Sequence, residues 1–135
     1  MSYAERMLST YPGQVAADPA LLVACIDACF DCAQACTACA DACMGEGQPD
    51  LASCIRLDLD CAAQCLQTGQ TVTRQTALDI QGAVSSLQAC ADACARCAGE
   101  CESHAGHGMK HCEVCAEACR ACEQACHALV AGLAA

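Results

Sequence analysis

The chain has 135 residues, enough for one domain with a buried core. Its formal net charge of −10 and its six Lys and Arg residues disfavour nucleic acid and anionic membranes as partners, because phosphate binding requires clustered positive charge. Cysteine supplies 18 residues, whereas Tyr3, Tyr11 and Phe30 are the only aromatic residues. A cysteine content this high is typical of a disulfide scaffold or a metal protein.

Residues 1–17 are expected to form a short leader. Tyr3, Met7, Leu8 and Tyr11 have the spacing of one helix face, which would pack against the rest of the protein, and Pro12 would end it. The N-terminus lacks the basic start and apolar run of a secretory signal, and no window approaches 18 uninterrupted apolar residues. We therefore expect a cytosolic protein without a membrane span. In a reducing cytosol, dense cysteine favours metal binding over disulfides.

The first long helix is predicted to begin at Asp18-Pro19, an N-cap followed by proline in the first helical position. It should run to about Met44, where Gly45 and Gly47 stop it. Its cysteines are spaced 4, 3, 4, 3 and 4 residues apart, which is the spacing of a heptad seam and places every thiol on one helix face. They are Cys25, Cys29, Cys32, Cys36, Cys39 and Cys43.

A second helix should open at Pro49 and end near Gly69. Its cysteines are Cys54, Cys61 and Cys65, spaced 7 and 4 residues apart. Asp58 occupies the seam position that lacks a thiol. A buried carboxylate is costly unless it is paired or bound, so Asp58 is either a metal ligand or a polar group near a wet end of the bundle.

The third helix is expected to begin with Thr71 or Thr73 as its cap and to run for about 30 residues to His104, with Gly82 as a weak point. Its cysteines follow a spacing of 4, 3 and 4. They are Cys90, Cys94, Cys97 and Cys101.

The fourth helix should begin near Met109, after the break at Gly106 and Gly108, and run to about Val130. Its thiols follow a spacing of 3, 4, 3 and 4. They are Cys112, Cys115, Cys119, Cys122 and Cys126.

Four amphipathic helices with short links predict an all-α fold, an antiparallel four-helix bundle over residues 18–135 with all 18 thiols facing inward. One end of this bundle should carry potential soft ligands, namely Met44, His104, His107, Met109 and His111. The opposite end should be plugged by hydrocarbon from Leu21, Leu22, Val72, Leu78, Ile80, Leu87, Leu129 and Leu133.

Disulfides within one helix are disfavoured, because neighbours three or four residues apart have Cβ atoms about 5–6 Å apart, wider than a disulfide allows. A bridging metal fits better. Cu(I) accepts low coordination and thiolate ligands, and one Cu(I) per shared thiolate leaves a neutral core, whereas Zn²⁺ on four thiolates leaves two negative charges. Iron–sulfur clusters usually take cysteines from loops, and one catalytic thiol does not need 18 cysteines.

The repeated C-x₃-C-x₂-C pattern on four helices resembles the cytosolic branch of the bacterial copper storage proteins, over about residues 18–130. This resemblance implies a non-catalytic store that holds many Cu(I) ions inside the bundle, with the stripe cysteines as ligands, and assembly into a homotetramer. An iron–sulfur or thiol redox protein and a zinc store remain the alternatives.

Several residues other than cysteine are further candidate ligands. His104 continues the Cys90–Cys101 stripe and is the expected first relay for ions entering at the His and Met end, with Met109 beside it. His111 precedes Cys115 by four residues and should reach metal beside the stripe. Apolar packing is the alternative role for Met109.

Overall fold

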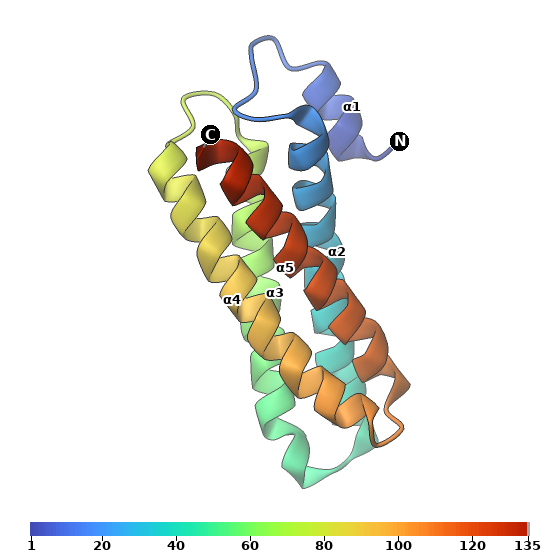
Figure 1. Cartoon of the computed structure of the whole chain (residues 1–135). Coiled ribbons are helices and arrows are strands. Elements are labelled where there is room, and N and C mark those ends of the chain that lie inside the picture. Colours follow the sequence, from blue (N-terminus) through green and yellow to red (C-terminus); the bar gives the residue numbers. More distant parts are fainter. Residues whose placement is uncertain (135) are drawn as a thin grey trace.

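The computed structural model describes residues 1–134, which are almost entirely helical, with four long helices packed side by side (Figure 1). In chain order the elements are α1 (Tyr3–Ser9), α2 (Pro19–Glu46), the short 3₁₀ helix η1 (Pro49–Leu51), α3 (Ala52–Thr73), α4 (Ile80–Ala105) and α5 (Lys110–Ala134). Helix α2 packs on α3 and α5, and α4 packs on the same two helices. The predicted antiparallel four-helix bundle is confirmed, while its predicted boundary at residue 135 lies outside the described residues.

Helix α2 begins where the sequence predicts and ends at Glu46, two residues later than predicted, so Gly45 lies inside the helix and only Gly47 stops it. The Asp18 carboxylate accepts a hydrogen bond from the Ala20 N–H at 3.0 Å, which satisfies one of the free amides of the first turn. At the other end Gly47 adopts a left-handed conformation, with φ of 69°, and its N–H donates to the Met44 carbonyl. Glycine adopts this conformation without the steric cost of a Cβ atom, so the helix ends here.

The predicted end of the second helix near Gly69 is wrong, because α3 continues to Thr73. A Cβ atom on Gly69 would lie 3.1 Å from the Phe30 ring and 3.2 Å from Cβ of Cys29. Gly69 therefore allows α2 and α3 to approach closely rather than ending a helix.

The predicted start of the third helix is also wrong. Thr71 and Thr73 lie inside α3, and their hydroxyls donate to carbonyls one turn earlier. Helix α4 begins at Ile80, with Asp79 preceding it. Gly82 then falls in the first turn, where a Cβ atom would lie 2.8 Å from the Asp79 carboxylate, and it is not a weak point in mid-helix.

The leader is held to the bundle by the loop between α3 and α4. The side chain of Gln75 accepts a hydrogen bond from the Ala16 N–H at 2.8 Å and donates to the Val72 carbonyl at 2.7 Å. The hydroxyls of Tyr11 and Thr76 lie 2.8 Å apart. Helix α1 thus lies beside the start of α2, at the upper end of the bundle in Figure 1.

We call this upper end of the bundle, where α2 and α4 begin and α3 and α5 end, the apolar end. Leu22, Val72, Leu87 and Leu129 are fully buried there, as the sequence predicts, whereas Ile80, also predicted to fill this end, is exposed. By length and composition alone α2 could cross a membrane; its buried residues, which include Leu22 and six cysteines, pack inside the bundle.

Replacing Leu129 by Ala should lower the free energy of unfolding by about 2–5 kcal/mol, because it removes a fully buried side chain and leaves a cavity. The measurement is urea denaturation of the reduced, copper-free protein. Val114→Ala, on the exposed face of α5, is the control and should change the stability by less than about 0.5 kcal/mol. Equal stability of the two variants would mean that the apolar end is not a packed core.

Candidate metal centre

The four long helices enclose a column of sulfur atoms, which we call the lumen. All 18 cysteines are free thiols, and each is at most 2% exposed. Neighbouring sulfurs from different helices approach within van der Waals distance, for example Cys36 and Cys119 at 3.5 Å and Cys65 and Cys90 at 3.7 Å. The heptad spacing of the sequence therefore produces one continuous set of soft donors rather than separate pairs.

The donors fall into layers along the bundle. Four groups share no member, and within each group every donor atom lies within 4.8 Å of the others. From the apolar end downward they are Cys29, Cys90, Cys122 and Cys126; Cys32, Cys61, Cys65 and Cys94; Cys36, Cys97, Cys115 and Cys119; and Cys39, Cys43, Cys112 and His111. Other groups overlap them, such as one that combines Cys32 and Cys36 with Cys61 and Cys119, so sulfurs of adjacent layers are close enough to share an ion.

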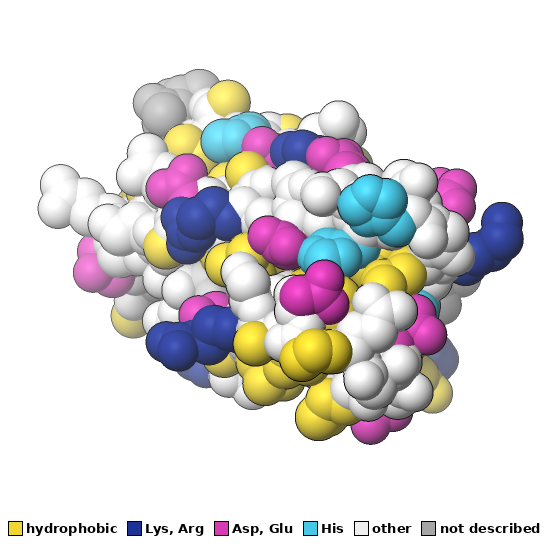
Figure 2. Space-filling view, turned by 90° about the horizontal axis from the view of Figure 1, so that it is seen from below, with side chains coloured by type: hydrophobic (Ala, Val, Ile, Leu, Met, Phe, Trp, Pro, Cys, Tyr) yellow, Lys and Arg dark blue, Asp and Glu magenta, His cyan; other side chains and the backbone are white. Residues whose placement is uncertain are grey.

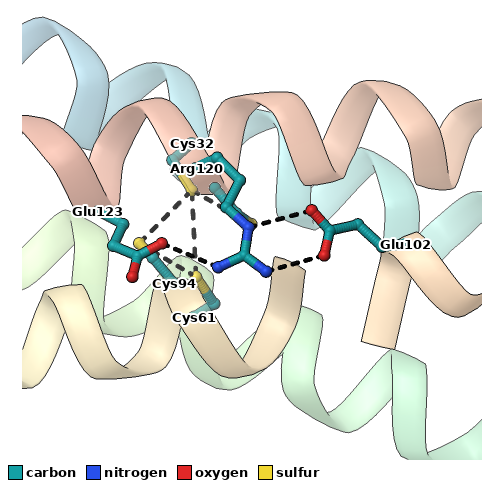
Figure 3. A network of polar contacts seen from close by, with 7 residues as sticks. Cys32, Cys61, Cys94, Glu102, Arg120 and Glu123 are labelled. Carbon is teal, nitrogen blue, oxygen red and sulfur yellow. Dashed lines mark hydrogen bonds and ion pairs between the residues drawn. The ribbon is translucent and has the colours of Figure 1, made fainter. Parts of the chain in front are cut away.

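The outer surface contrasts with this interior. Figure 3 shows the thiols of Cys32, Cys61 and Cys94 between the helices, with Arg120 of α5 outside them. Arg120 donates two hydrogen bonds to Glu102 of α4, at 2.8 and 3.0 Å, and a third to Glu123. The charged groups of Arg120, Glu102 and Glu123 thus lie on the outer face of the bundle, away from the sulfurs.

The sulfur spacing suits trigonal and tetrahedral coordination. With metal–sulfur bonds near 2.3 Å, a trigonal site places its sulfurs about 4.0 Å apart and a tetrahedral site about 3.8 Å apart. Cys32, Cys61 and Cys94 lie 3.8–4.0 Å apart, close to both values. A linear unit needs about 4.5 Å, so it would require the thiols to separate.

Burial favours the protonated, uncharged form of the thiols beside the α2–α3 and α4–α5 links. Burial raises the pKa of Cys54 and Cys112 above the ordinary thiol value, and that of Cys43 to about 11. Protonated thiols pack as small apolar side chains, so the bundle can form without metal. Each ion that binds must displace thiol protons, and the affinity for soft cations should rise with pH.

Asp58 lies inside the lumen, fully buried, and not near a wet end of the bundle. Its Oδ1 accepts hydrogen bonds from the thiols of Cys97 at 3.0 Å, Cys115 at 3.4 Å and Cys101 at 3.7 Å. Its other oxygen, Oδ2, has no hydrogen-bond partner among the described residues. Burial raises the pKa of Asp58, although the thiol hydrogen bonds oppose this shift.

Replacing Asp58 by Asn should therefore flatten the pH dependence of stability. Between the unfolded pKa of about 3.9 and the raised folded-state pKa, the unfolded chain has lost the Asp58 proton while the folded protein keeps it, so stability falls as pH rises, by up to about 1.4 kcal/mol per unit. Asn has no such proton, and the copper-free variant should gain stability relative to the parent protein as pH increases. Urea denaturation at several pH values measures this difference, and parallel curves would contradict the assignment.

We call the opposite end of the bundle, at the α2–α3 and α4–α5 links, the open end. His111 reaches the lumen there: its Nδ1 lies 3.5 Å from Sγ of Cys39 and 3.6 Å from Sγ of Cys112. Its Nε2 faces Glu46 Oε2 at 3.4 Å. Burial alone would lower the pKa of His111, but its hydrogen bonds with Cys39 and Glu46 raise it. Figure 2 looks onto this end and shows histidines among carboxylates and hydrophobic side chains.

The remaining candidates of this end differ in position. The structure places Nε2 of His104 2.7 Å from Glu100 Oε2, one turn earlier on α4, rather than on a sulfur. Met109 is partly buried against the core, whereas Met44 and His107 are exposed.

The sequence analysis missed Glu46 as the partner of His111. The two residues are 65 positions apart, and the only signal was that Glu46 follows Cys43 by three residues at the end of α2.

The chain is similar to copper storage proteins of known structure. A structure of the copper storage protein Ccsp from Streptomyces lividans, loaded with 10 copper equivalents, is 49% identical and has a TM-score of 0.91; the match covers 96% of this chain and 99% of that one. A structure of copper loading, with five coppers, to a cytosolic copper storage protein from the same organism is 52% identical, with a TM-score of 0.80 and coverage of 84% and 95%. None of the curated proteins compared with the chain matches it. The family model described as copper storage protein (Csp) matches residues 19–131, and the chain therefore belongs to the copper storage protein family.

Proposed function

We propose that this protein is a non-catalytic cytosolic store that holds many Cu(I) ions on the thiolates of the lumen. The observation that carries this function is the continuous column of 18 buried, free thiols. An enzyme with one nucleophilic thiol, or a protein with one metal cluster, would need only a few of these thiols. A metal store uses all of them, because each additional thiol adds capacity.

Charge favours Cu(I) as the stored ion. When one Cu(I) replaces one thiol proton, the buried site stays neutral. Because one sulfur can bridge two Cu(I) ions, every layer can bind copper. A divalent ion on four unshared thiolates carries two uncompensated negative charges into a region without solvent, which costs several kcal/mol. The three all-cysteine layers are therefore poor zinc stores, although their geometry accepts a tetrahedral ion.

The iron–sulfur and thiol redox alternatives fit less well. Iron–sulfur clusters are typically wrapped by loops, whereas these cysteines lie on the inner faces of four long helices. A thiol–disulfide buffer needs accessible sulfur, and these thiols are at most 2% exposed.

We further propose as ligands all 18 cysteines, together with Asp58 and His111. Asp58 supplies a carboxylate among three thiols, and His111 offers Nδ1 to two. Copper would enter at the open end, since fully buried leucines block the apolar end. There His104 and Met109 are weaker candidates for transient binding, His104 because it must leave Glu100 to do so.

The resemblance to the family implies a homotetramer, which we also propose. Exposed Tyr3, Met7 and Phe30 surround a hollow between α1 and α2 and give the surface an apolar face suited to association. Sedimentation equilibrium of the reduced protein should give about four times the chain mass of 13.8 kDa. A mass of 13.8 kDa at micromolar concentration would contradict the proposal.

Reversible loading tests the storage function. Reduced protein is filled with Cu(I) under anaerobic conditions and then treated with a Cu(I)-specific chelator in excess. We expect a colourless loaded protein, since Cu(I) is d¹⁰, and full return of both copper and reactive thiols. Brown protein that contains iron after anaerobic purification, or copper that the chelator cannot recover, would contradict storage.

A further inference from the structure

The layer at the open end differs from the others in its donor set. Cys39, Cys43 and Cys112 supply three thiols and His111 supplies one imidazole nitrogen, all within 4.8 Å of one another. A divalent ion bound to the four thiolates of an all-cysteine layer gives a net charge of −2. The same ion bound to three thiolates and a neutral imidazole gives a net charge of −1. The side chain of His111 is also 27% exposed, so this layer is the one nearest to solvent.

The distances among Cys39, Cys112 and His111 match a tetrahedral site, and the sulfur of Cys43 lies within 4.8 Å of these three donor atoms. With zinc–sulfur bonds near 2.3 Å and a zinc–nitrogen bond near 2.05 Å, a tetrahedron requires S···N distances of about 3.6 Å and S···S distances of about 3.8 Å. The observed values are 3.5 and 3.6 Å from Nδ1 of His111 to the two sulfurs, and 3.9 Å between Cys39 and Cys112.

The hydrogen bond on the far side of the ring supplies a second, independent observation. Nε2 of His111 lies 3.4 Å from Glu46 Oε2, and in the tautomer that carries its proton on Nε2 this nitrogen donates to Glu46 while the Nδ1 lone pair faces the sulfurs. Metal-binding histidines commonly donate their other nitrogen to a carboxylate in this way, because the hydrogen bond fixes the tautomer and the ring orientation. Glu46 would therefore act as a positioning residue.

We propose that the open end holds one divalent cation of the zinc class in a Cys₃His site formed by Cys39, Cys43, Cys112 and His111 and oriented by Glu46. Binding converts three thiols into thiolates and releases three protons to solvent, while the imidazole stays neutral. The inner layers, which would carry the larger buried charge, bind such a cation more weakly. A cation in this site occupies the donors that lie across the open end of the lumen.

Co²⁺ is a suitable probe, because its visible d–d bands report tetrahedral geometry and its charge-transfer bands report thiolate. The reduced, copper-free full chain is titrated with Co²⁺ without oxygen. We expect the first equivalent to give tetrahedral bands, and one equivalent of Zn²⁺ to remove them. No copper is used, so the result is independent of whether the lumen stores Cu(I).

Matched variants test the assignment of the ligands. His111→Ala should lower the affinity for the first equivalent of Co²⁺ by at least about 100-fold, and Glu46→Gln should lower it by about 10-fold or more. His127→Ala and Glu113→Gln, which alter exposed residues of α5, should bind like the parent protein. His111→Cys restores a fourth donor, and its tetrahedral bands should return with stronger thiolate charge transfer.

Circular dichroism would verify that each variant keeps its helices. Two outcomes would overturn the proposal: a six-coordinate Co²⁺ spectrum, or a first equivalent whose spectrum and affinity are the same in the parent protein and in His111→Ala.

Discussion

Filling the lumen with Cu(I) should raise the thermal unfolding midpoint by more than about 20 °C. A ligand that binds the folded state at 100 times its dissociation constant contributes about 2.7 kcal/mol per site, and this bundle offers many sites. Copper also binds cysteines of the unfolded chain, which reduces the gain. For a domain of this size even about 6 kcal/mol of net stabilisation corresponds to an increase of this order.

The measurement is the loss of helical circular dichroism on heating, in reductant, with and without copper. The copper-free protein should already be strongly helical at room temperature, because protonated thiols pack as small hydrophobic groups. A copper-free spectrum of random coil would contradict a preformed lumen. A midpoint that copper leaves unchanged would place the ions on the surface, outside the folded core.

The sequence predicts the lumen well because one simple rule determines it. Spacings of three and four residues place side chains on one face of any regular helix, so the inward direction of Cys25 or Cys126 does not depend on the details of packing. The apolar end follows from the same rule and from the short links. Both features are confirmed by the burial of all 18 thiols and of Leu22 and Leu129.

The predicted helix boundaries between α3 and α4 failed for a local reason. Glycine and threonine are ambiguous signals: Gly69 allows two helices to approach, and Thr73 returns its hydroxyl to the Gly69 carbonyl at 2.6 Å. The sequence shows the residue type but not the neighbour that gives it its role. Asp79 is a further example: it precedes α4 and is a residue type that commonly caps helices, but its side chain makes no capping hydrogen bond.

The roles of the non-cysteine residues were harder to predict. His104 and His111 both lie near a cysteine stripe, and the spacing favoured His104 as the first relay. In the structure Glu100, four residues earlier on the same helix, binds His104, whereas Glu46 from a distant segment directs His111 toward the sulfurs. A carboxylate one turn away competes with the thiols for a histidine. The outcome depends on side-chain rotamers, which the spacing of residues in the sequence does not specify.

Copper capacity follows directly from the geometry of the lumen. Because layers overlap through shared neighbours such as Cys36 and Cys119, sulfurs can bridge ions, and the number of ions should approach the number of thiols rather than a quarter of it. We expect roughly one Cu(I) per cysteine, with a few ions more or fewer according to the contributions of Asp58 and His111. Isolated four-donor sites would instead give one ion per layer.

The most direct test of the central claim is an anaerobic Cu(I) titration of the reduced protein, with bound ions counted by native mass spectrometry and free thiols by a thiol reagent. The account predicts saturation near the number of cysteines, 18 per chain, and almost no thiol left reactive at the end point. Saturation at about four or five ions, with most thiols still reactive, would indicate isolated four-thiolate sites of the zinc type and would contradict copper storage.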